Sequence, residues 1–468
     1  MEGEQRKLLG MPFCFAGMGI FRAWTETVYA NTSIVFPIQA NAFADFTAFN
    51  MITAITLVVV ALGASRIAPL YGKSWPAPVA AICLIASTCC NFYSILDPGT
   101  SQYLGIPAVI AGGVGIAFLI LLWSELFGCL NPLRVALYYS GGIVVGSLIL
   151  WLFKGLALPW LFVCTCLVPM VSLACLKQAY SYLPDTERPH ATWGSFSLPW
   201  KPIAVVALYS FSYGLCEHVF EGPLGIHSGL GCVFAGVLVY ACISLRRTAF
   251  QFSALCKIAL LLIVFSLVPF GDFLPRGSFI SSFCALGSYT LCLIVIMIIL
   301  SNLVYRYGVN ALWLFGIERA VRLVSVQAGI GTRDLTSLVA SPFAVDVALG
   351  VVVTLSVVFA TKLLLSEKQL SSPWGAVLKE TLEDDQNMPT ERNRLGIKCQ
   401  ELAERAALTQ REEEILLLLA QRKKPADIER ELFVANSTVK THVKHIYQKL
   451  DVHSRKELFN LLGIENAG

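Results

Sequence analysis

Long apolar runs separated by short loops fill the chain from Leu8 to Leu365, and the sequence beyond them is polar. A helix needs about 20 mostly apolar residues to cross the hydrocarbon core of a bilayer, and about twelve of these runs meet that length. The expected spans lie near Leu9–Ala30, Phe46–Ala64, Pro76–Ile95, Leu104–Phe127, Leu133–Phe153, Gly155–Leu176, Pro202–Phe220, Gly229–Leu245, Leu255–Phe270, Phe279–Tyr305, Val309–Gly329 and Ser337–Leu365.

A longer polar loop, Lys177–Lys201, divides these spans into two sets of six. Two packed halves are a common layout of polytopic membrane proteins. The sequence therefore predicts an all-α membrane bundle over residues 1–365, with its halves at 9–177 and 202–365. The span at 309–329 has the weakest pattern, because three charged residues lie in its middle.

Lysine and arginine gather in alternate loops. If the N-terminus is cytoplasmic, the loops on the opposite side of the membrane hold only Lys154, Arg276 and Arg333, and the cytoplasmic loops hold many more. This bias follows the positive-inside rule. We therefore predict a multi-pass protein of the cell membrane with both termini in the cytoplasm, which requires an even number of spans.

The composition agrees with a lipid environment. The 468 residues are 56% hydrophobic and 14% charged, whereas soluble domains carry about 25% charged residues. Of fifteen cysteines only Cys399 lies outside the apolar body, and no histidine cluster accompanies the others. We therefore expect no metal site, and no cofactor. An enzyme is not expected either, because no nucleophile–base pair or phosphate-binding loop is present.

Charge is costly inside a bilayer and usually marks a site, and five of the charged residues inside the expected spans are candidates for one. Arg22 and Glu26 are four residues apart and share a helix face, and Glu318 and Arg322 repeat that spacing. Asp346 stands alone in the last span. One hypothesis is that these side chains line a small-molecule site. The alternative is that they pair with one another and lock the helices together.

The polar C-terminal part divides into a linker, residues 366–405, and a helical head, residues 406–468. A helix is expected over Leu395–Ala407. Four more helices follow, and Thr409 with Glu412 can form a capping box at the first of them. Pro425 is well placed to open the second helix. The third begins near Asn436 or Ser437, either of which can cap it.

The third helix of the head has two different faces. Val439, Val443, Ile446 and Leu450 follow the spacing of a buried stripe. The opposite stripe is basic and polar, and no acidic residue occurs from 436 to 450. Such a helix, reached by a tight turn from a short helix, suits insertion into the major groove of DNA. The residues of this stripe are Lys440, Lys444 and Gln448, flanked by Thr441, His445 and Lys449.

The head closely resembles the LuxR-type helix-turn-helix. The motifs that carry the resemblance are Leu408-Thr409-x-Arg411-Glu412-x-Glu414-Ile415, Thr438-Val439-Lys440-Thr441-His442-Val443 and Lys449-Leu450-x-Val452-His453-Ser454-Arg455. The resemblance implies that Lys440, Thr441 and Lys444 meet DNA bases, with Thr438 and His442 nearer the phosphates. It also implies a homodimer contact through the last helix, 454–462, and we expect Ser454, Leu458, Leu461 and Leu462 to form it.

The head departs from the family pattern at three places. Arg422 and Lys423 occupy a loop where glycine is common, Glu429 replaces a usual alanine, and Ala435 replaces a usual serine. These departures affect the details of phosphate contact rather than the fold.

The body resembles major facilitator transporters in its span count, two halves and central loop. The loop between its second and third spans reads GASRIAPLYGKSW, which keeps Gly72 and Lys73 of that superfamily's signature. Pro69 and Leu70, however, stand where its Asp and Arg would fall.

The whole chain also looks like bacterial LuxR-type regulators with a twelve-span sensor body. The leading hypothesis is therefore a one-component regulator of the bacterial cell membrane, whose partners are the lipid bilayer, a small molecule and double-stranded promoter DNA. The alternatives are a transporter with an appended regulatory head, and a body that only anchors the head to the membrane.

Overall fold

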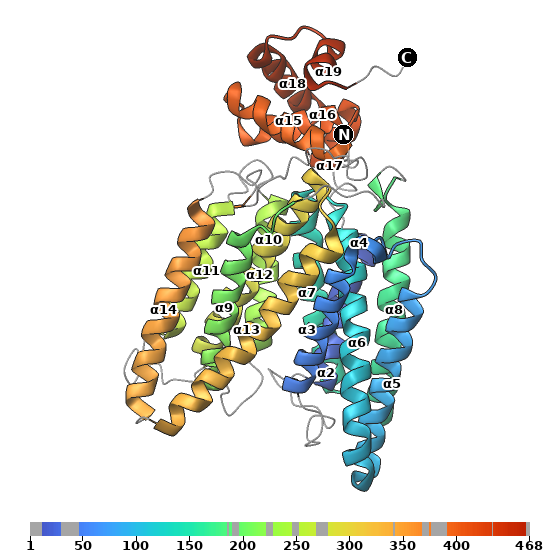
Figure 1. The fold of residues 1–468 in the computed structure, drawn as a ribbon, viewed down its shortest axis with the longest axis vertical. Coiled ribbons are helices and arrows are strands. Elements are labelled where there is room, and N and C mark those ends of the chain that lie inside the picture. Colours follow the sequence, from blue (N-terminus) through green and yellow to red (C-terminus); the bar gives the residue numbers. More distant parts are fainter. Residues whose placement is uncertain are drawn as a thin grey trace.

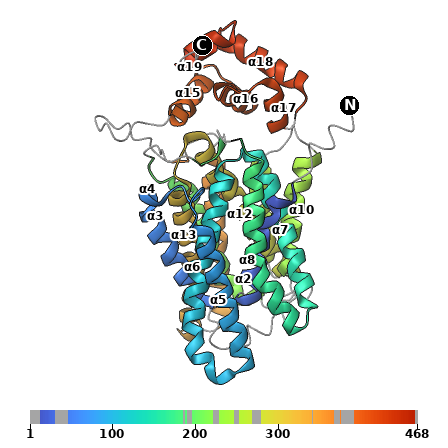
Figure 2. The same ribbon diagram turned by 90° about the vertical axis from the view of Figure 1, so that its right-hand side faces the viewer.

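The computed structural model describes residues 12–29, 46–184, 187–189, 196–220, 228–245, 252–267, 279–339, 342–366, 374–375, 391–432 and 434–464. The elements within these residues are all helical. They form a tall bundle of long helices with a smaller cluster of short helices, the head, stacked on one end (Figures 1 and 2). Each part has its own hydrophobic core.

Each of the twelve ranges expected to span the membrane corresponds to one of the longer helices, although several of these helices begin or end outside the expected range. Two short pieces, α4 (Ala64–Ile67) and η3 (Pro98–Thr100), lie in loops, and η1 (Phe13–Ala16) leads into the first helix. The twelve helices are α2 (Gly17–Val28), α3 (Phe46–Leu62), α5 (Pro76–Leu96), α6 (Ser101–Gly128), α7 (Pro132–Lys154), α8 (Leu158–Ser181), α9 (Trp200–Phe220), α10 (Ser228–Leu245), α11 (Phe252–Leu267), α12 (Phe279–Tyr307), α13 (Ala311–Val339) and α14 (Pro342–Ser366).

Among the described residues, six helices are long and apolar enough to cross a membrane, and they belong to α5, α6, α7, α8, α12 and α14. α3 and parts of α10 and α11 form shorter apolar helices. The outer surface of the bundle exposes large apolar side chains, among them Leu62 at 80% and Leu152 at 71%. Soluble proteins rarely expose such extended apolar surface, so the bundle suits a bilayer.

Glycines let helices of the bundle approach at backbone distance. A Cβ atom added at Gly19 of α2 would lie 1.6 Å from the carbonyl oxygen of Gly142 on α7. The pair Gly214 on α9 and Gly329 on α13 forms a second such crossing, where a Cβ on Gly214 would lie 2.1 Å from the Val326 oxygen. Small residues are the usual means of close helix packing in membranes.

The head consists of α15 (Glu391–Arg405), α16 (Gln410–Ala420), α17 (Pro425–Leu432), α18 (Asn436–Leu450) and α19 (Arg455–Leu462). The capping box predicted at Thr409 and Glu412 is present at the start of α16. α15 lies in the segment taken as linker, yet its Cys399, Leu402 and Ala403 belong to the core of the head. α15 also contacts α12 of the bundle.

The predicted cap of α18 is wrong. Ala435 is the N-cap residue and no side chain caps the helix. The Asn436 amide instead donates a hydrogen bond of 2.8 Å to the Glu429 carboxylate on α17. The glutamate that departs from the family pattern therefore has a partner across the turn, and it recruits the side chain that was expected to cap.

Candidate functional site

The basic stripe of α18 is open to solvent. Lys440, Thr441, Lys444 and Gln448 are exposed, whereas Val439 and Ile446 on the opposite side are fully buried. In both ribbon views α18 lies on the side of the head remote from the bundle, and α17 lies nearer to it (Figures 1 and 2). The side chains expected to read bases thus share one unobstructed face.

Thr438 and His442 are half-buried at the edge of that face. Burial lowers the pKa of His442, and the nearby Arg411 guanidinium lowers it further. The Nδ1 atom of His442 is buried and accepts or donates no hydrogen bond within the described residues. A neutral imidazole at this position can offer one hydrogen bond without adding to the positive charge.

Glu412 ties α16 to α18. Burial alone would raise the pKa of Glu412, but the hydrogen bonds from Lys449 and from the Thr409 backbone outweigh it, so the pKa is lowered. The Lys449 ammonium lies 2.7 Å from the Glu412 carboxylate. Glu412, His442 and His445 could also hold a metal ion by spacing alone, but the lysine already satisfies that carboxylate. The cluster is best explained as an ion pair that fixes α18.

The four residues expected at a dimer contact do not share one surface. Leu458 and Leu462 are buried in the core of the head, Leu461 is half-buried, and Ser454 caps α19 by accepting from the Glu457 backbone N–H. Only Leu461 and Ser454 are accessible enough to meet a second copy directly.

Residues 406–462 match the family model of bacterial regulatory proteins, luxR family. The same region is 38% identical over 61 residues to the spore germination protein GerE of Bacillus subtilis, covering 13% of this chain and 82% of that protein. The chain belongs to the LuxR family. The matched family consists of bacterial regulatory proteins, and this chain shares the LuxR-type head with them.

Longer relatives match this chain over a short segment. The transcriptional regulatory protein LiaR of Bacillus subtilis is 49% identical over 51 residues, 11% of this chain and 24% of LiaR. The HTH-type transcriptional regulator MalT of Vibrio campbellii is 44% identical over 57 residues, 12% of this chain and 6% of MalT. The chain thus spans a small fraction of the length of these relatives.

The LuxR-type head is docked on the bundle by three consecutive residues at the end of α12. The Tyr305 hydroxyl donates to Glu431 on α17 at 2.7 Å, and the Tyr307 hydroxyl donates to Gln400 on α15 at 2.6 Å. Between them, Arg306 forms an ion pair of 2.5 Å with Glu413 on α16. The Arg306 and Glu413 side chains are 4% and 1% exposed, so this pair is desolvated.

A second set of contacts surrounds Glu431. Lys423 bridges Glu431 and Glu187, a residue of the loop between α8 and α9, and its ammonium lies 2.6 Å from the Glu187 carboxylate. The Asn131 amide, before α7, donates to the Glu431 backbone oxygen at 2.9 Å. Segments from three places in the bundle therefore converge on the helix that precedes the turn.

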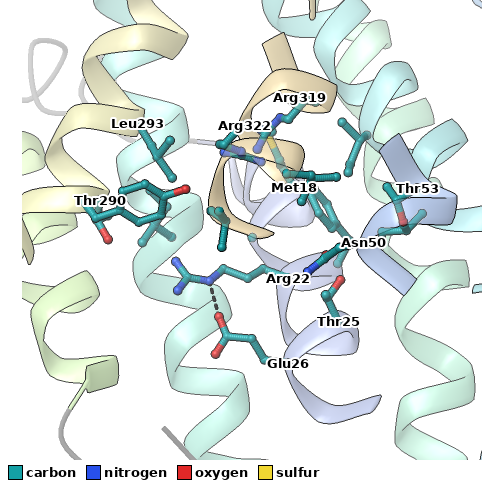
Figure 3. Close-up of a pocket in the computed structure, with 18 of the residues that line it drawn as sticks. Met18, Arg22, Thr25, Glu26, Asn50, Thr53, Thr290, Leu293, Arg319 and Arg322 are labelled. Carbon is teal, nitrogen blue, oxygen red and sulfur yellow. Dashed lines mark hydrogen bonds and ion pairs between the residues drawn. The ribbon is translucent and has the colours of Figure 1, made fainter. Parts of the chain in front are cut away.

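A cavity of about 260 Å³ lies inside the bundle. Helices α2, α3, α6 and α7 line it on one side, and α9, α12 and α13 on the other. Figure 3 shows Arg22 paired with Glu26 on α2, with Arg319 and Arg322 extending from α13. Three tyrosines also line the cavity: Tyr139, Tyr213 and Tyr289.

The structure brings together some of the charged residues expected at a ligand site. Arg22, Glu26 and Arg322 line the cavity. Glu318 is buried beside it and lies 3.6 Å from the adjacent Arg319 rather than forming the expected pair four residues along. Asp346 belongs to α14, but its side chain lies outside the described part of the structure.

Several functional residues were missed from the sequence. Arg319 is one of the three charged residues in the middle of the 309–329 span, and its position one turn from Arg322 was a signal that it could line the same site. Arg306 follows the expected span 279–305, and nothing in the sequence points to its partner 107 residues away. Among the aromatic residues of the spans, Tyr213 and Tyr289 line the cavity, whereas Trp24 is buried and donates a hydrogen bond to Thr88 on α5.

Proposed function

We propose that this chain is a membrane-bound one-component transcriptional regulator, in which a small molecule bound by the helical bundle controls DNA binding by the LuxR-type head. The observation that carries the proposal is the direct physical link between a lined cavity and a family DNA-binding head. A cavity alone would fit many membrane proteins, and a LuxR-type head alone would fit a soluble regulator.

All twelve long helices are proposed to cross the bilayer as two six-helix halves, in the manner of the major facilitator layout. The six helices outside the apolar set are shorter or less apolar. They include α2 and α13, whose mean hydropathy is lowered by the arginines that line the cavity. Both termini then lie in the cytoplasm of a bacterial cell, where the head can reach DNA. The charge bias of the loops supports this orientation.

The head is proposed to read promoter DNA by placing α18 in the major groove. Lys440, Thr441 and Lys444 would contact bases, Gln448 would extend that face, and Thr438 and His442 would lie near phosphates. Two copies would pair through the outer surface of α19, with Leu461 and Ser454 at the contact. Leu458 and Leu462 would support that surface from inside the head.

α12 is the proposed route between ligand and DNA. Tyr289, Thr290 and Leu293 of this helix line the cavity, and Tyr305 and Arg306 hold the head. The distance along the helix from Thr290 to Arg306 is about 24 Å at 1.5 Å per residue. A ligand that favours one position of α12 would move all three docking residues together, and it acts only through its different affinities for the two states.

Transport remains the alternative, since helices of both proposed halves line the cavity, and secondary transporters place substrate between their halves. The position of Pro69 and Leu70 in the loop signature disfavours it. Saturable uptake by proteoliposomes that is sensitive to Glu26→Gln would support it.

The proposal is tested by mapping bound DNA across the genome with Lys440→Ala and Lys444→Ala. Each substitution should reduce promoter occupancy about tenfold or more, because a base contact contributes about 1–3 kcal/mol. Membrane insertion should be unchanged. Lys398→Ala is the matched control, since Lys398 is an exposed lysine on α15, outside the proposed reading helix α18 and the proposed dimer helix α19. Equal occupancy in all three variants and the parent chain would reject α18 as the reading helix.

A further inference from the structure

We infer that the cavity of the bundle takes a small organic monoanion, such as a carboxylate, attached to an apolar body. This inference rests on the proposed sensing function, and it names the chemical class of the ligand. It follows from the size, charge and unsatisfied donors of the cavity.

The volume sets the size of the ligand. About 260 Å³ lies near the lower end of the range of small-molecule sites, which is about 300–1,000 Å³. The volume therefore suits a small organic molecule.

The charge of the lining favours an anion. Among the described residues that line the cavity, Arg22, Arg319 and Arg322 are cationic and Glu26 is the one acid. Glu318, whose carboxylate lies 3.6 Å from the Arg319 Nε atom, brings the acids of this neighbourhood to two against three arginines. An excess of positive charge is costly in a medium of low dielectric constant, and a bound anion offsets that cost.

Arg319 supplies a donor without an acceptor. The residue is 6% exposed, and its Nε atom has no hydrogen-bond partner within the described residues. The nearest carboxylate oxygen, on Glu318, lies at 3.6 Å, beyond hydrogen-bonding distance. Buried donors in folded proteins are nearly always paired. A carboxylate is the acceptor that best matches the planar fork of a guanidinium.

A second polar atom points to the same ligand. The Thr25 hydroxyl, on α2, lines the cavity and is also buried without a partner among the described residues. Glu26 is less suited to hold a cation, because it already accepts a hydrogen bond from Arg22. Among the described lining residues, the cavity therefore offers unpaired donors at Arg319 and Thr25 to an anion, whereas its one carboxylate is already paired with Arg22.

The remaining lining suits an apolar and flat body. Phe21, Phe46 and Phe49 line the cavity from α2 and α3. On the opposite side the rings of Tyr213 and Tyr289 are stacked, with centroids 4.5 Å apart. Aromatic walls of this kind favour an aromatic or branched apolar group next to the carboxylate.

The test is binding to the full-length protein in detergent, measured by calorimetry and thermal unfolding. The probes are 3-phenylpropionate, benzoate, 4-methylpentanoate and hexanoate, each compared with its primary amide and with the amine of matching length. At least one carboxylate should bind, and at least about tenfold more tightly than its amide, because the amide leaves the arginines without a charged partner. The amines should not bind. A series in which no carboxylate binds, or in which an amide or amine binds as tightly, would overturn the inference.

The arginines are tested by substitution. Arg319→Gln and Arg322→Gln should each weaken carboxylate binding at least about tenfold, and Arg333→Gln should leave it unchanged. Arg333 is the matched control, because it lies on α13 outside the cavity. If Arg319→Gln does not fold, Arg319→Lys keeps the charge but loses the planar fork, and it should still weaken binding. Full affinity in the folded variants would contradict the assignment.

Promoter occupancy in cells separates this inference from the proposed function. If a carboxylate binds the protein but promoter occupancy does not change, the inferred ligand class is supported and the proposed control of DNA binding by the ligand is rejected. If promoter occupancy responds to a neutral or cationic compound that acts through the cavity, the proposed control of DNA binding by a ligand is supported and the inferred ligand class is overturned.

Discussion

Arg422 has a left-handed backbone conformation, with φ at 62°, in the loop between α16 and α17. The resemblance to LuxR-type heads led us to expect glycine in this loop. Side chains other than glycine pay roughly 1–2 kcal/mol for that conformation, because Cβ lies too close to the carbonyl oxygen. Arg422 therefore adopts the left-handed backbone conformation that glycine would adopt here, and the head is less stable by that conformational free energy.

Arg422→Gly should raise the free energy of unfolding of the head by about 1 kcal/mol, less than the full backbone cost, because glycine also makes the unfolded chain more flexible. Urea unfolding of residues 391–468, which contain all of the buried core of the head except Tyr305 of α12, measures the change. Arg430→Gly is the matched control. It places glycine inside α17 and should lower stability by about 1 kcal/mol. Equal losses in both variants would contradict the conformational explanation.

The presence of each helix was easier to predict from the sequence than its first and last residues. α13 was expected over 309–329, and the helix runs from Ala311 to Val339. Its charged residues weaken the apolar pattern, so the span was the least certain of the twelve ranges. The close crossing at Gly214 and Gly329 holds it in place, and a contact between distant glycines leaves no mark in local periodicity. The capping box of α16 was predictable because both of its residues lie within four positions.

The crossing of α2 and α7 offers a test at the same scale. Gly19→Ala should lower the thermal stability of the detergent-solubilised protein by about 1–3 kcal/mol or more, because its Cβ would overlap the Gly142 oxygen and push the two helices apart. Since Gly19 also lines the cavity, carboxylate binding should weaken too.

Gly350→Ala is the control for that substitution. No heavy atom lies within 4 Å of a Cβ built at Gly350 on α14, and alanine is the better helix former by up to about 1 kcal/mol. Its stability should be unchanged or slightly higher. A Gly19→Ala protein as stable as this control would show that α2 and α7 can separate without cost.

At the scale of the whole molecule, the sequence indicated a membrane body and a DNA-binding head but gave no sign of how they meet. Hydrophobic periodicity reports which face of a helix is buried, and family motifs report the fold of the head. The docking contacts join ordinary residue types, such as Tyr307 and Gln400, across 93 positions of the chain. Only the folded structure places them together.

The Arg306–Glu413 pair gives the sharpest test of that contact. Removing one partner of a buried ion pair leaves an uncompensated charge and costs about 3–5 kcal/mol, whereas replacing both with apolar residues is often neutral. Arg306→Met and Glu413→Gln should therefore each release the head, and the double variant Arg306→Met/Glu413→Met should dock again. Energy transfer between bioorthogonal labels at the exposed Lys177 and Lys456 reports the separation of bundle and head.

Asp427→Asn is the control for these variants. The Arg430–Asp427 pair on α17 is 63% and 47% exposed, and exposed pairs contribute about 0–1 kcal/mol, so its loss should not change the separation. If the single Arg306 and Glu413 variants keep the separation of the parent chain, the ion pair does not hold the head. If both release the head and promoter occupancy no longer responds to a bound carboxylate, α12 transmits the signal through this contact, because the bundle and the head are otherwise unchanged in these proteins.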